Sequence, residues 1–355
     1  MENKRRVIKL LLIIGSSLFI QACSSVGYYW EKIQGHTELL NKQQPIQVVI
    51  DNPLTNPDVK TLLINAQQAR NFASKVLLLP DNGSYRNYVD VGRDYVVWTV
   101  VATPPYSIQP EEWCFLIVGC LSYRGYFSEQ AAKEFAVTLK DKNMDVYVSG
   151  AKAYSTLGWF DDPLLSTMLY KSEAYRVGII FHELAHQKIY VENDTAFNEA
   201  FATSVELEGV KAWFNKTENK QKFKQYLVVK KRDKDFKSLL NVARKELKIL
   251  YESNKPPQQL QIGKEKIFVN LQASYKHYKK KWNNYTGYDK WMAQGLNNAH
   301  LALVATYNNW LPAFSRLFEN ANGDYKIFYN EVKRLTELDK MQREKKLEEL
   351  MNTDD

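Results

Sequence analysis

The amino-acid sequence predicts an α+β fold that is predominantly α-helical, with a small antiparallel sheet ahead of the main helical region. Three observations lead to this expectation. The chain has 355 residues, of which 45% are hydrophobic and 25% charged, so it can bury a sizeable core. Residues 85–103 are rich in aromatic and β-branched side chains, which favour strands. From Pro163 onward, apolar residues recur at helical spacing and few helix-breaking residues interrupt them.

The N-terminal α+β region is expected to cover residues 23–150. Its expected elements are a tether and helix within 25–44, a helix at 59–76, a hairpin at 85–103 and a strand at 145–149. The second helix should begin near Asn56-Pro57, because Asn favours the N-cap and Pro favours the first turn. The hairpin would turn at Gly92-Arg93-Asp94.

The region from 151 to 325 is expected to be helical. The predicted helices are residues 175–190, 196–214, one or two helices in 216–254, and then 270–283, 297–307 and 310–320. Residues 326–355 should form a charged C-terminal helix or tail. Lys and Glu dominate its end, which favours a frayed helix on the surface.

The first 22 residues have the features of a bacterial export signal. Basic residues at 4–6 precede a short apolar run at 10–20, which is too short to span a bilayer comfortably. A small residue followed by Cys23 resembles the lipobox of bacterial lipoproteins. We therefore expect removal of residues 1–22, acyl chains on Cys23, and an outer-membrane anchor facing the periplasm, because Ser24 is not the Asp of an inner-membrane retention signal. An ordinary secretory signal with a chance cysteine is the alternative.

The net charge gives no indication of a strongly charged partner such as nucleic acid. The signal carries four basic residues and one acidic residue, so its removal lowers the net charge from +8 to +5. So mild a charge gives no footprint for nucleic acid, and we expect none to bind.

Two further cysteines, Cys114 and Cys120, lie close together in the sequence. In an oxidising compartment such a pair is typical of a local disulfide. Zinc binding by the two thiols is less well supported, because neither a His nor a third Cys lies nearby. Two buried free thiols remain the structural alternative.

The segment His182-Glu183-Leu184-Ala185-His186 is the most informative motif of the chain. Residues four apart lie on one face of a helix, so the two imidazoles can bind one zinc ion. Glu183 lies about 100° round the helix from His182 and can act as a general base without binding the metal. Two surface histidines on an amphipathic helix are the alternative interpretation.

A third protein ligand must come from outside this motif. Glu199 lies on the next predicted helix, and an antiparallel return would bring it opposite the two histidines, with one coordination position left open. Glu192 is the nearest alternative and falls in the turn. Glu206 shares a helix face with Glu199 and is either a partner of a histidine N–H or a surface charge.

The combination of His-Glu-x-x-His with Asn-Glu-x-Phe-Ala is similar to the gluzincin metallopeptidases. The mature chain as a whole resembles the Aminopep family of zinc aminopeptidases found among proteobacterial lipoproteins. The resemblance rests on residues 113–127, 157–164, 181–187, 198–202 and 297–314. It implies that region 151–325 is a zincin-like catalytic region that hydrolyses peptides, with one Zn²⁺ held by His182, His186 and Glu199 and with Glu183 as the base.

The resemblance also implies a side chain that stabilises the reacting oxygen, because gluzincins often use a Tyr or His from the C-terminal part. Tyr307 is the candidate, and His300 is the other choice. Residues 157–162 either line the substrate cleft or form a packed turn. Two features differ from better-known gluzincins: Glu199 follows His186 after only 13 residues, and no Gly-x-Met-Glu-Asn-like segment is present. The rival hypothesis is a non-catalytic envelope lipoprotein, structural or binding, with a vestigial zinc site.

Overall fold

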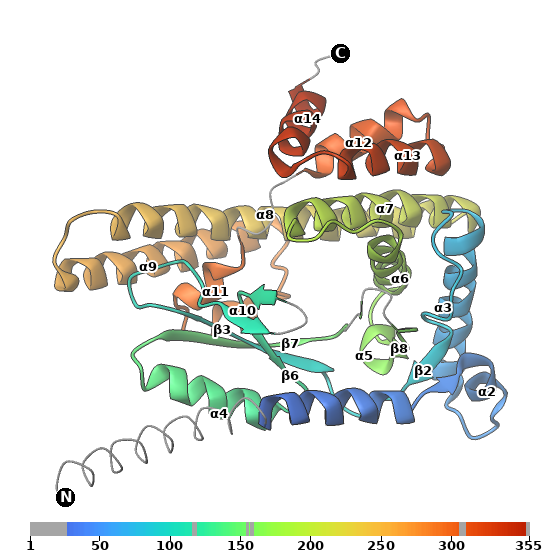
Figure 1. Cartoon of the computed structure of the whole chain (residues 1–355), viewed down its shortest axis with the longest axis horizontal. Coiled ribbons are helices and arrows are strands. Elements are labelled where there is room, and N and C mark those ends of the chain that lie inside the picture. Colours follow the sequence, from blue (N-terminus) through green and yellow to red (C-terminus); the bar gives the residue numbers. More distant parts are fainter. Residues whose placement is uncertain (1–26, 116–118, 154–155, 157–159, 305–309, 353–355) are drawn as a thin grey trace, which may run out of the picture.

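The computed structural model describes residues 27–352, apart from 116–118, 154–155, 157–159 and 305–309. It confirms an α+β fold that is predominantly helical (Figure 1). Cys23 and Tyr307 lie outside the described residues. None of the helices in the described part of the chain combines the length and apolar composition needed to cross a membrane.

Within the described part of the chain, the strands form three small sheets. The first contains β1 (Gln44–Pro45), β2 (Asn87–Val89) and β8 (Leu164–Leu165), in that order. The second has the order β6 (Arg124–Tyr126), β3 (Val97–Thr103) and β7 (Asp145–Ala151). The third pairs β4 (Trp113–Phe115) with β5 (Gly119–Leu121). All pairings are antiparallel except that of β2 with β8.

The predicted strand at 145–149 is confirmed as β7, but the predicted hairpin at 85–103 is wrong. Its two halves, β2 and β3, belong to different sheets. β2 pairs with β8, and the Val91 N–H donates to the Ser166 hydroxyl at 3.0 Å, so the chain after β2 is held by a distant segment. β3 pairs along its full length with β7. Positive φ at Gly92 marks a turn, as expected, but the turn joins two sheets.

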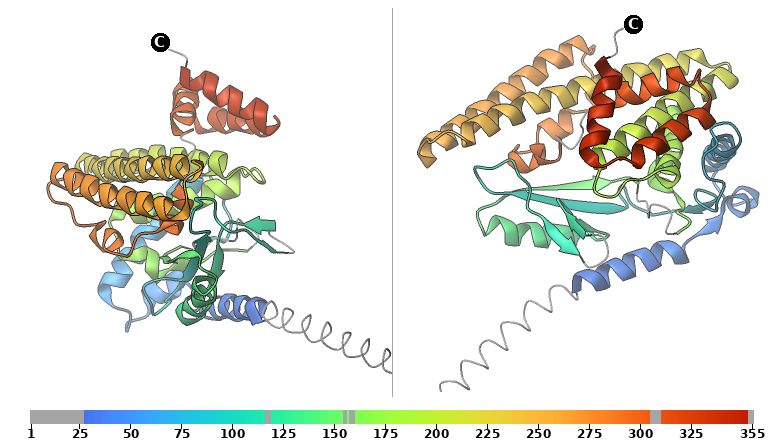
Figure 2. Two further views of the ribbon diagram at one scale, coloured as in Figure 1. Left: turned by 90° about the vertical axis from the view of Figure 1, so that its left-hand side faces the viewer. Right: turned by 45° about the horizontal axis from the view of Figure 1, so that its top comes forward.

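Long helices cover the sheets and form most of the core. They are α3 (Pro57–Lys75), α6 (Glu173–Lys188), α7 (Thr195–Lys216), α8 (Lys220–Tyr251) and α9 (Pro257–Lys281). Shorter helices are α2 (Ile46–Asp51), α4 (Glu129–Lys140), α5 (Ser166–Leu169), α10 (Asp289–Met292) and α11 (Asn298–Ala302). Figures 1 and 2 show α8 and α9 as a long pair that extends to one side. Residues 27–41 form a further helix along the opposite edge of the molecule.

Local capping explains where several helices begin. The Asn56 side chain accepts a hydrogen bond from the Asp58 N–H, and Pro57 occupies the first turn of α3, as predicted. Ser172 and Asp194 cap α6 and α7 in the same way. The break at Pro256-Pro257 is also confirmed, but α9 begins directly at Pro257 and not at residue 270.

The C-terminal segment forms α12 (Leu311–Asn320), α13 (Tyr325–Thr336) and α14 (Lys340–Asn352), which stack above α7 in Figure 1. The expectation of a frayed surface helix at the C-terminus is wrong. Leu347 is buried in the main core, and buried Arg343 forms an ion pair of 2.8 Å with Asp194. The charged residues of α14 therefore include one that fastens it to the start of α7.

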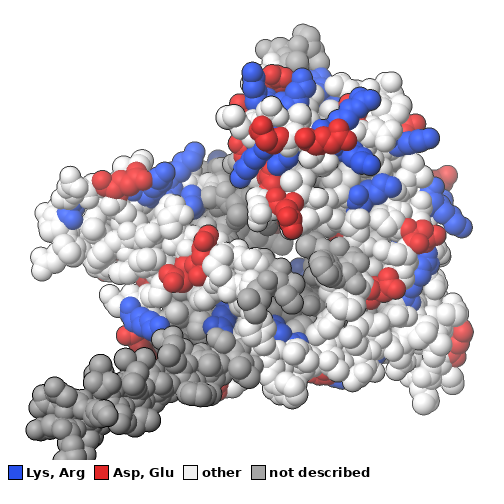
Figure 3. All heavy atoms as spheres, in the orientation of Figure 1, with Lys and Arg blue, Asp and Glu red and all other residues white. Residues whose placement is uncertain are grey.

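Charges of both signs are interspersed over the face shown in Figure 3.

The two cysteines form the predicted disulfide, Cys114–Cys120, across the β4–β5 pair.

Candidate metal centre

Helix α6 places the side chains of both histidines of the motif close together. His182 and His186 lie one turn apart, and their Nε2 atoms are separated by 3.2 Å. The apolar residues between and before them, including Phe181 and Leu184, are fully buried. The helix is therefore anchored by one face in the core while the other face carries the two imidazoles.

Helix α7 brings Glu199 opposite the histidines, as predicted. Its carboxylate oxygens lie 3.4 Å from His182 Nε2 and 3.5 Å from His186 Nε2. Among the described residues, these three side chains form the group of potential metal donors, and Glu192 is not part of it.

The loop between α6 and α7 explains how the short spacing to Glu199 is possible. The Asn198 side chain accepts a hydrogen bond from the Val191 N–H at 2.8 Å and donates one to the Val191 carbonyl at 2.7 Å. Asp194 caps α7 just before Glu199. These bonds hold a tight turn, so 13 residues are enough for the antiparallel return.

The donor set fits a tetrahedral zinc ion. Bonds of about 2.0–2.2 Å in tetrahedral geometry separate neighbouring donor atoms by roughly 3.3–3.6 Å. The two Nε2 atoms lie 3.2 Å apart, and each has a different oxygen of the Glu199 carboxylate near it, at 3.4 Å and 3.5 Å, which is close to that spacing. Two neutral imidazoles and one carboxylate are also a donor set that zinc accepts.

The electrostatics of the site favour a positive charge between these side chains. Burial opposes protonation of His182, but hydrogen bonds to Glu199 and Glu206 raise its pKa to about 10. Burial likewise opposes the charge on Glu199, but hydrogen bonds from the two histidines hold its pKa well below the usual range. A cation at this point would take over the role of the proton on His182.

Glu206 is the partner of a histidine and not a surface charge. Its Oε2 lies 3.4 Å from His182 Nδ1, while its Oε1 accepts hydrogen bonds from Lys230 Nζ at 2.6 Å and from the Tyr226 hydroxyl at 2.9 Å. Burial would raise the pKa of Glu206, but Lys230 and His182 lower it to about 2. Gly178 makes room for Glu206, because a Cβ at that position would meet its Oε1 at 3.0 Å.

Glu183 lies on the same helix but outside the donor group. Burial raises the pKa of its carboxyl group, against the opposing effect of His182 and His186. A carboxylate of raised pKa is a stronger base than an ordinary one.

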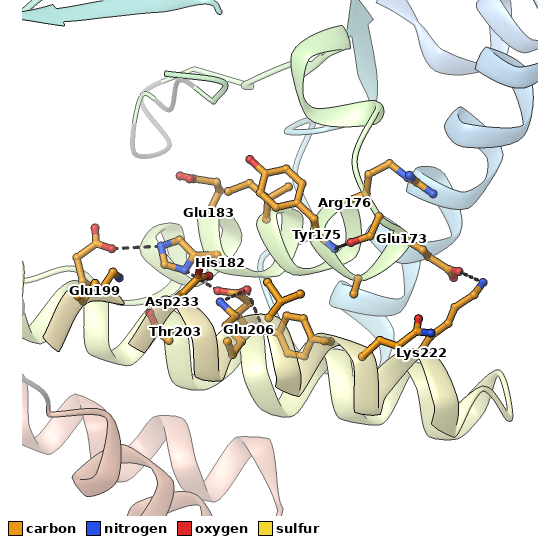
Figure 4. Close-up of a pocket in the computed structure, with 18 residues that line it drawn as sticks. Glu173, Tyr175, Arg176, His182, Glu183, Glu199, Thr203, Glu206, Lys222 and Asp233 are labelled. Atoms are coloured by element: carbon orange, nitrogen blue, oxygen red, sulfur yellow. Dashed lines mark hydrogen bonds and ion pairs between the residues drawn. The ribbon is translucent and has the colours of Figure 1, made fainter. Parts of the chain in front are cut away.

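A cleft of about 970 Å³ reaches the metal donors between α6, α7 and α8. Glu183 and Tyr175 line it, and Figure 4 shows both on the same side of α6. Tyr175 is absent from the residues predicted from the sequence, although its position seven residues before His182 places it on the same face of the helix. Three further residues were not predicted from the sequence and line the cleft from α8: Tyr226, Lys230 and Lys237. Their positions depend on how α8 packs, and no local motif indicates that.

The structure separates the other sequence candidates. His300 does not line the cleft; its ring stacks on Tyr147 at 4.1 Å and its Nδ1 accepts a hydrogen bond from the Asn297 N–H. Residues 157–159 of the segment 157–162 lie outside the described residues; at its end, buried Asp162 accepts hydrogen bonds from Thr156. The negative charge of Asp162 still acts on Glu183 and helps to raise its pKa.

Fold and site together define an α+β protein with a candidate His₂Glu metal centre on two neighbouring helices. The chain belongs to the Aminopep family, described as "Putative aminopeptidase", which it matches over residues 27–347. Comparisons with curated proteins and with solved structures gave no match.

Proposed function

We propose that the protein is a zinc-dependent peptidase, and more narrowly an aminopeptidase. One observation carries the proposal: the Nε2 atoms of His182 and His186 lie 3.2 Å apart, each with a Glu199 carboxylate oxygen within 3.5 Å, next to Glu183 at the wall of a large cleft. The family's description supports hydrolysis of peptides, and the narrower term aminopeptidase rests on that description alone.

His182, His186 and Glu199 would hold the zinc ion. A bound zinc ion would supply Lewis acidity at a peptide carbonyl and make a water molecule more acidic. Glu183 would take a proton from the water that attacks the carbonyl carbon, and would deliver it to the amine nitrogen as the C–N bond breaks.

The reacting carbonyl oxygen also needs a hydrogen-bond donor from the protein. Tyr307 remains our prediction from the family resemblance. Tyr175 is a second candidate, because its hydroxyl group lies in the cleft on the side of Glu183. Substituting each tyrosine with Phe separates the two, because only the donor should lower kcat when its hydroxyl is removed.

The base is tested by Glu183→Gln. The variant should keep its zinc, because Glu183 is not one of the donors, but should lose roughly 10²- to 10⁴-fold in turnover. Zinc content is measured by elemental analysis, and hydrolysis is measured on peptide amides. Glu192→Gln is the matched control and should behave as the wild type. Undiminished turnover in Glu183→Gln would refute the role of Glu183 as the general base.

The third ligand is tested by Glu199→Ala. Removing one of three protein ligands should lower zinc occupancy at a fixed chelator concentration. A fully metallated Glu199→Ala variant would assign the third-ligand role to another residue.

A non-catalytic envelope lipoprotein with a vestigial zinc site is the rival function. A purely structural zinc site is closed by a fourth protein ligand and has no use for a base. The presence of Glu183 beside three donors therefore favours hydrolysis. A zinc-loaded protein that cleaves no member of a peptide library, with amino termini free or blocked, would support the rival.

We also propose that the mature chain is lipid-anchored through Cys23 to the outer membrane, facing the periplasm. The basic and apolar segments before Cys23 support this. Mass spectrometry of the mature N-terminal peptide should find acyl chains on Cys23, and an unmodified peptide would contradict the anchor.

A further inference from the structure

The helix of residues 27–41 turns two of its three charged residues, Glu31 and Lys32, towards the protein, whereas Glu38 is exposed and pairs with Lys42. Its Glu31 carboxylate accepts hydrogen bonds from the N–H groups of Phe127 and Ser128, at 2.6 and 2.9 Å. The Lys32 ammonium lies 5.1–5.2 Å from the ring centres of Tyr28, Tyr126 and Phe127. These contacts use the charges of the helix to attach it to the protein.

The same face of the helix is closely packed. A Cβ at Gly35 would lie 2.2 Å from the Phe127 ring, so only glycine allows this approach. Leu39 is 3% exposed and belongs to the main core. The helix is therefore fixed in its orientation about its own axis.

The opposite face consists of Trp30, Ile33, Thr37 and Leu40, which we call the Trp30–Leu40 face. Trp30 is 60%, Ile33 58% and Leu40 40% exposed. Their spacing of three and four residues puts them on one side of the helix, and none of them is charged. A helix that borders water normally has charged or polar residues on its outer face, whereas three of the four residues of this face are large and apolar.

We propose that the Trp30–Leu40 face lies in the headgroup region of the membrane to which the chain is anchored. The proposal rests on the proposed lipid anchor. Cys23 is four residues before Gly27, so an extended chain separates the two by at most about 14 Å. Acyl chains on Cys23 would thus hold the start of the helix at the bilayer surface.

The chemistry of the face matches that environment. Trp is favoured at the membrane–water interface, and Tyr29, which is also exposed, lies next to it. Ile33 and Leu40 can enter the boundary between headgroups and acyl chains without burying a charge. The membrane would cover the apolar side chains that the folded chain leaves exposed.

This arrangement also orients the molecule. Figures 1 and 2 show the 27–41 helix along one edge and α12–α14 at the opposite side. With the helix on the bilayer, α12–α14 point away from it into the aqueous compartment.

The test uses the full-length lipoprotein, reconstituted in phosphatidylethanolamine–phosphatidylglycerol vesicles. A fluorescent label is attached to Ile33→Cys or, as the matched control, to Met341→Cys, which replaces an apolar side chain that is 77% exposed in α14. Lipids that carry a quencher should reduce emission from position 33 at least twofold and should leave position 341 unchanged. Equal emission at both positions in vesicles would overturn the proposal.

A second measurement removes the anchor. In a Cys23→Ala background, substituting Trp30, Ile33 and Leu40 together with Gln should lower vesicle binding by about tenfold or more, with an unchanged melting temperature. Unchanged binding would contradict the proposal. A dimer in detergent that shields position 33 without lipid would also overturn it, because a second copy would then cover the face.

Failure of the anchor and failure of the face are distinguishable. Quenching at position 33 with an unmodified Cys23 peptide would refute the anchor and support the face. An acylated Cys23 peptide without quenching would support the anchor and refute the face.

Discussion

Substituting Glu206 with glutamine keeps the shape of the side chain but removes the negative charge that faces His182 Nδ1 at 3.4 Å. A carboxylate in this position fixes the ring orientation and makes the imidazole a better ligand. Losing such a partner lowers metal affinity by roughly 10- to 100-fold, or about 1.4–2.7 kcal/mol. We expect Glu206→Gln to fall in that range.

The assay is a competition titration of zinc between the protein and a chromophoric chelator. Glu208→Gln is the matched control, because Glu208 lies on the same helix but pairs with Lys211 at 3.1 Å, outside the donor group. It should leave zinc affinity unchanged. A second variant, Glu206→Gln with Lys230→Met, tests whether the effect comes from leaving Lys230 without its partner. Zinc affinity within twofold of the wild type in Glu206→Gln, or an equal loss in Glu208→Gln, would refute the role that we assign to Glu206.

Two further predictions concern stability. Arg343→Met leaves Asp194 buried without its partner and should lower the free energy of unfolding by about 3–5 kcal/mol in urea titrations. Arg334→Met, which breaks an exposed pair with Glu331, should lower it by less than about 1 kcal/mol. Equal effects of the two substitutions would contradict a stabilising role of the Arg343–Asp194 pair. Burial lowers the pKa of His300 to about 4, so its neutral form contributes stability that is complete above pH 6.5 and is lost as the pH falls towards 4, by roughly 3 kcal/mol in total. His300→Gln should reduce this loss, and an equally steep pH dependence in the variant would show that other groups cause it.

Several helices, including the one with the two histidines, could be predicted because their signals are local. Asn56 and Pro57 mark the start of α3, and the apolar spacing before His182 marks α6. The four-residue spacing of the two histidines depends on nothing beyond one helix. Glu199 could be predicted because a short loop between two helices leaves few ways to return.

The errors concern pairings between distant segments. β3 pairs with β7 and not with β2, and nothing within residues 85–103 indicates which partner it takes. Glu206 remained ambiguous in the sequence because its partner Lys230 comes from another helix. The sequence around Arg343 has the composition of a solvated surface, but the partner of Arg343, Asp194, lies 149 residues earlier. Register and side-chain partners of this kind depend on packing, which periodicity does not encode.

The pairing of Asp194 with Arg343 has a consequence for the order in which the molecule is assembled. One carboxylate oxygen of Asp194 caps α7, and the other receives two hydrogen bonds from the guanidinium group of Arg343. The turn before Glu199 is thus held in part by Arg343, which lies on a helix near the end of the chain. A ribosome has to release almost the whole polypeptide before that contact can form. Loss of the C-terminal helix by early termination or proteolysis would therefore affect the candidate metal donors, even though α14 contributes none of them.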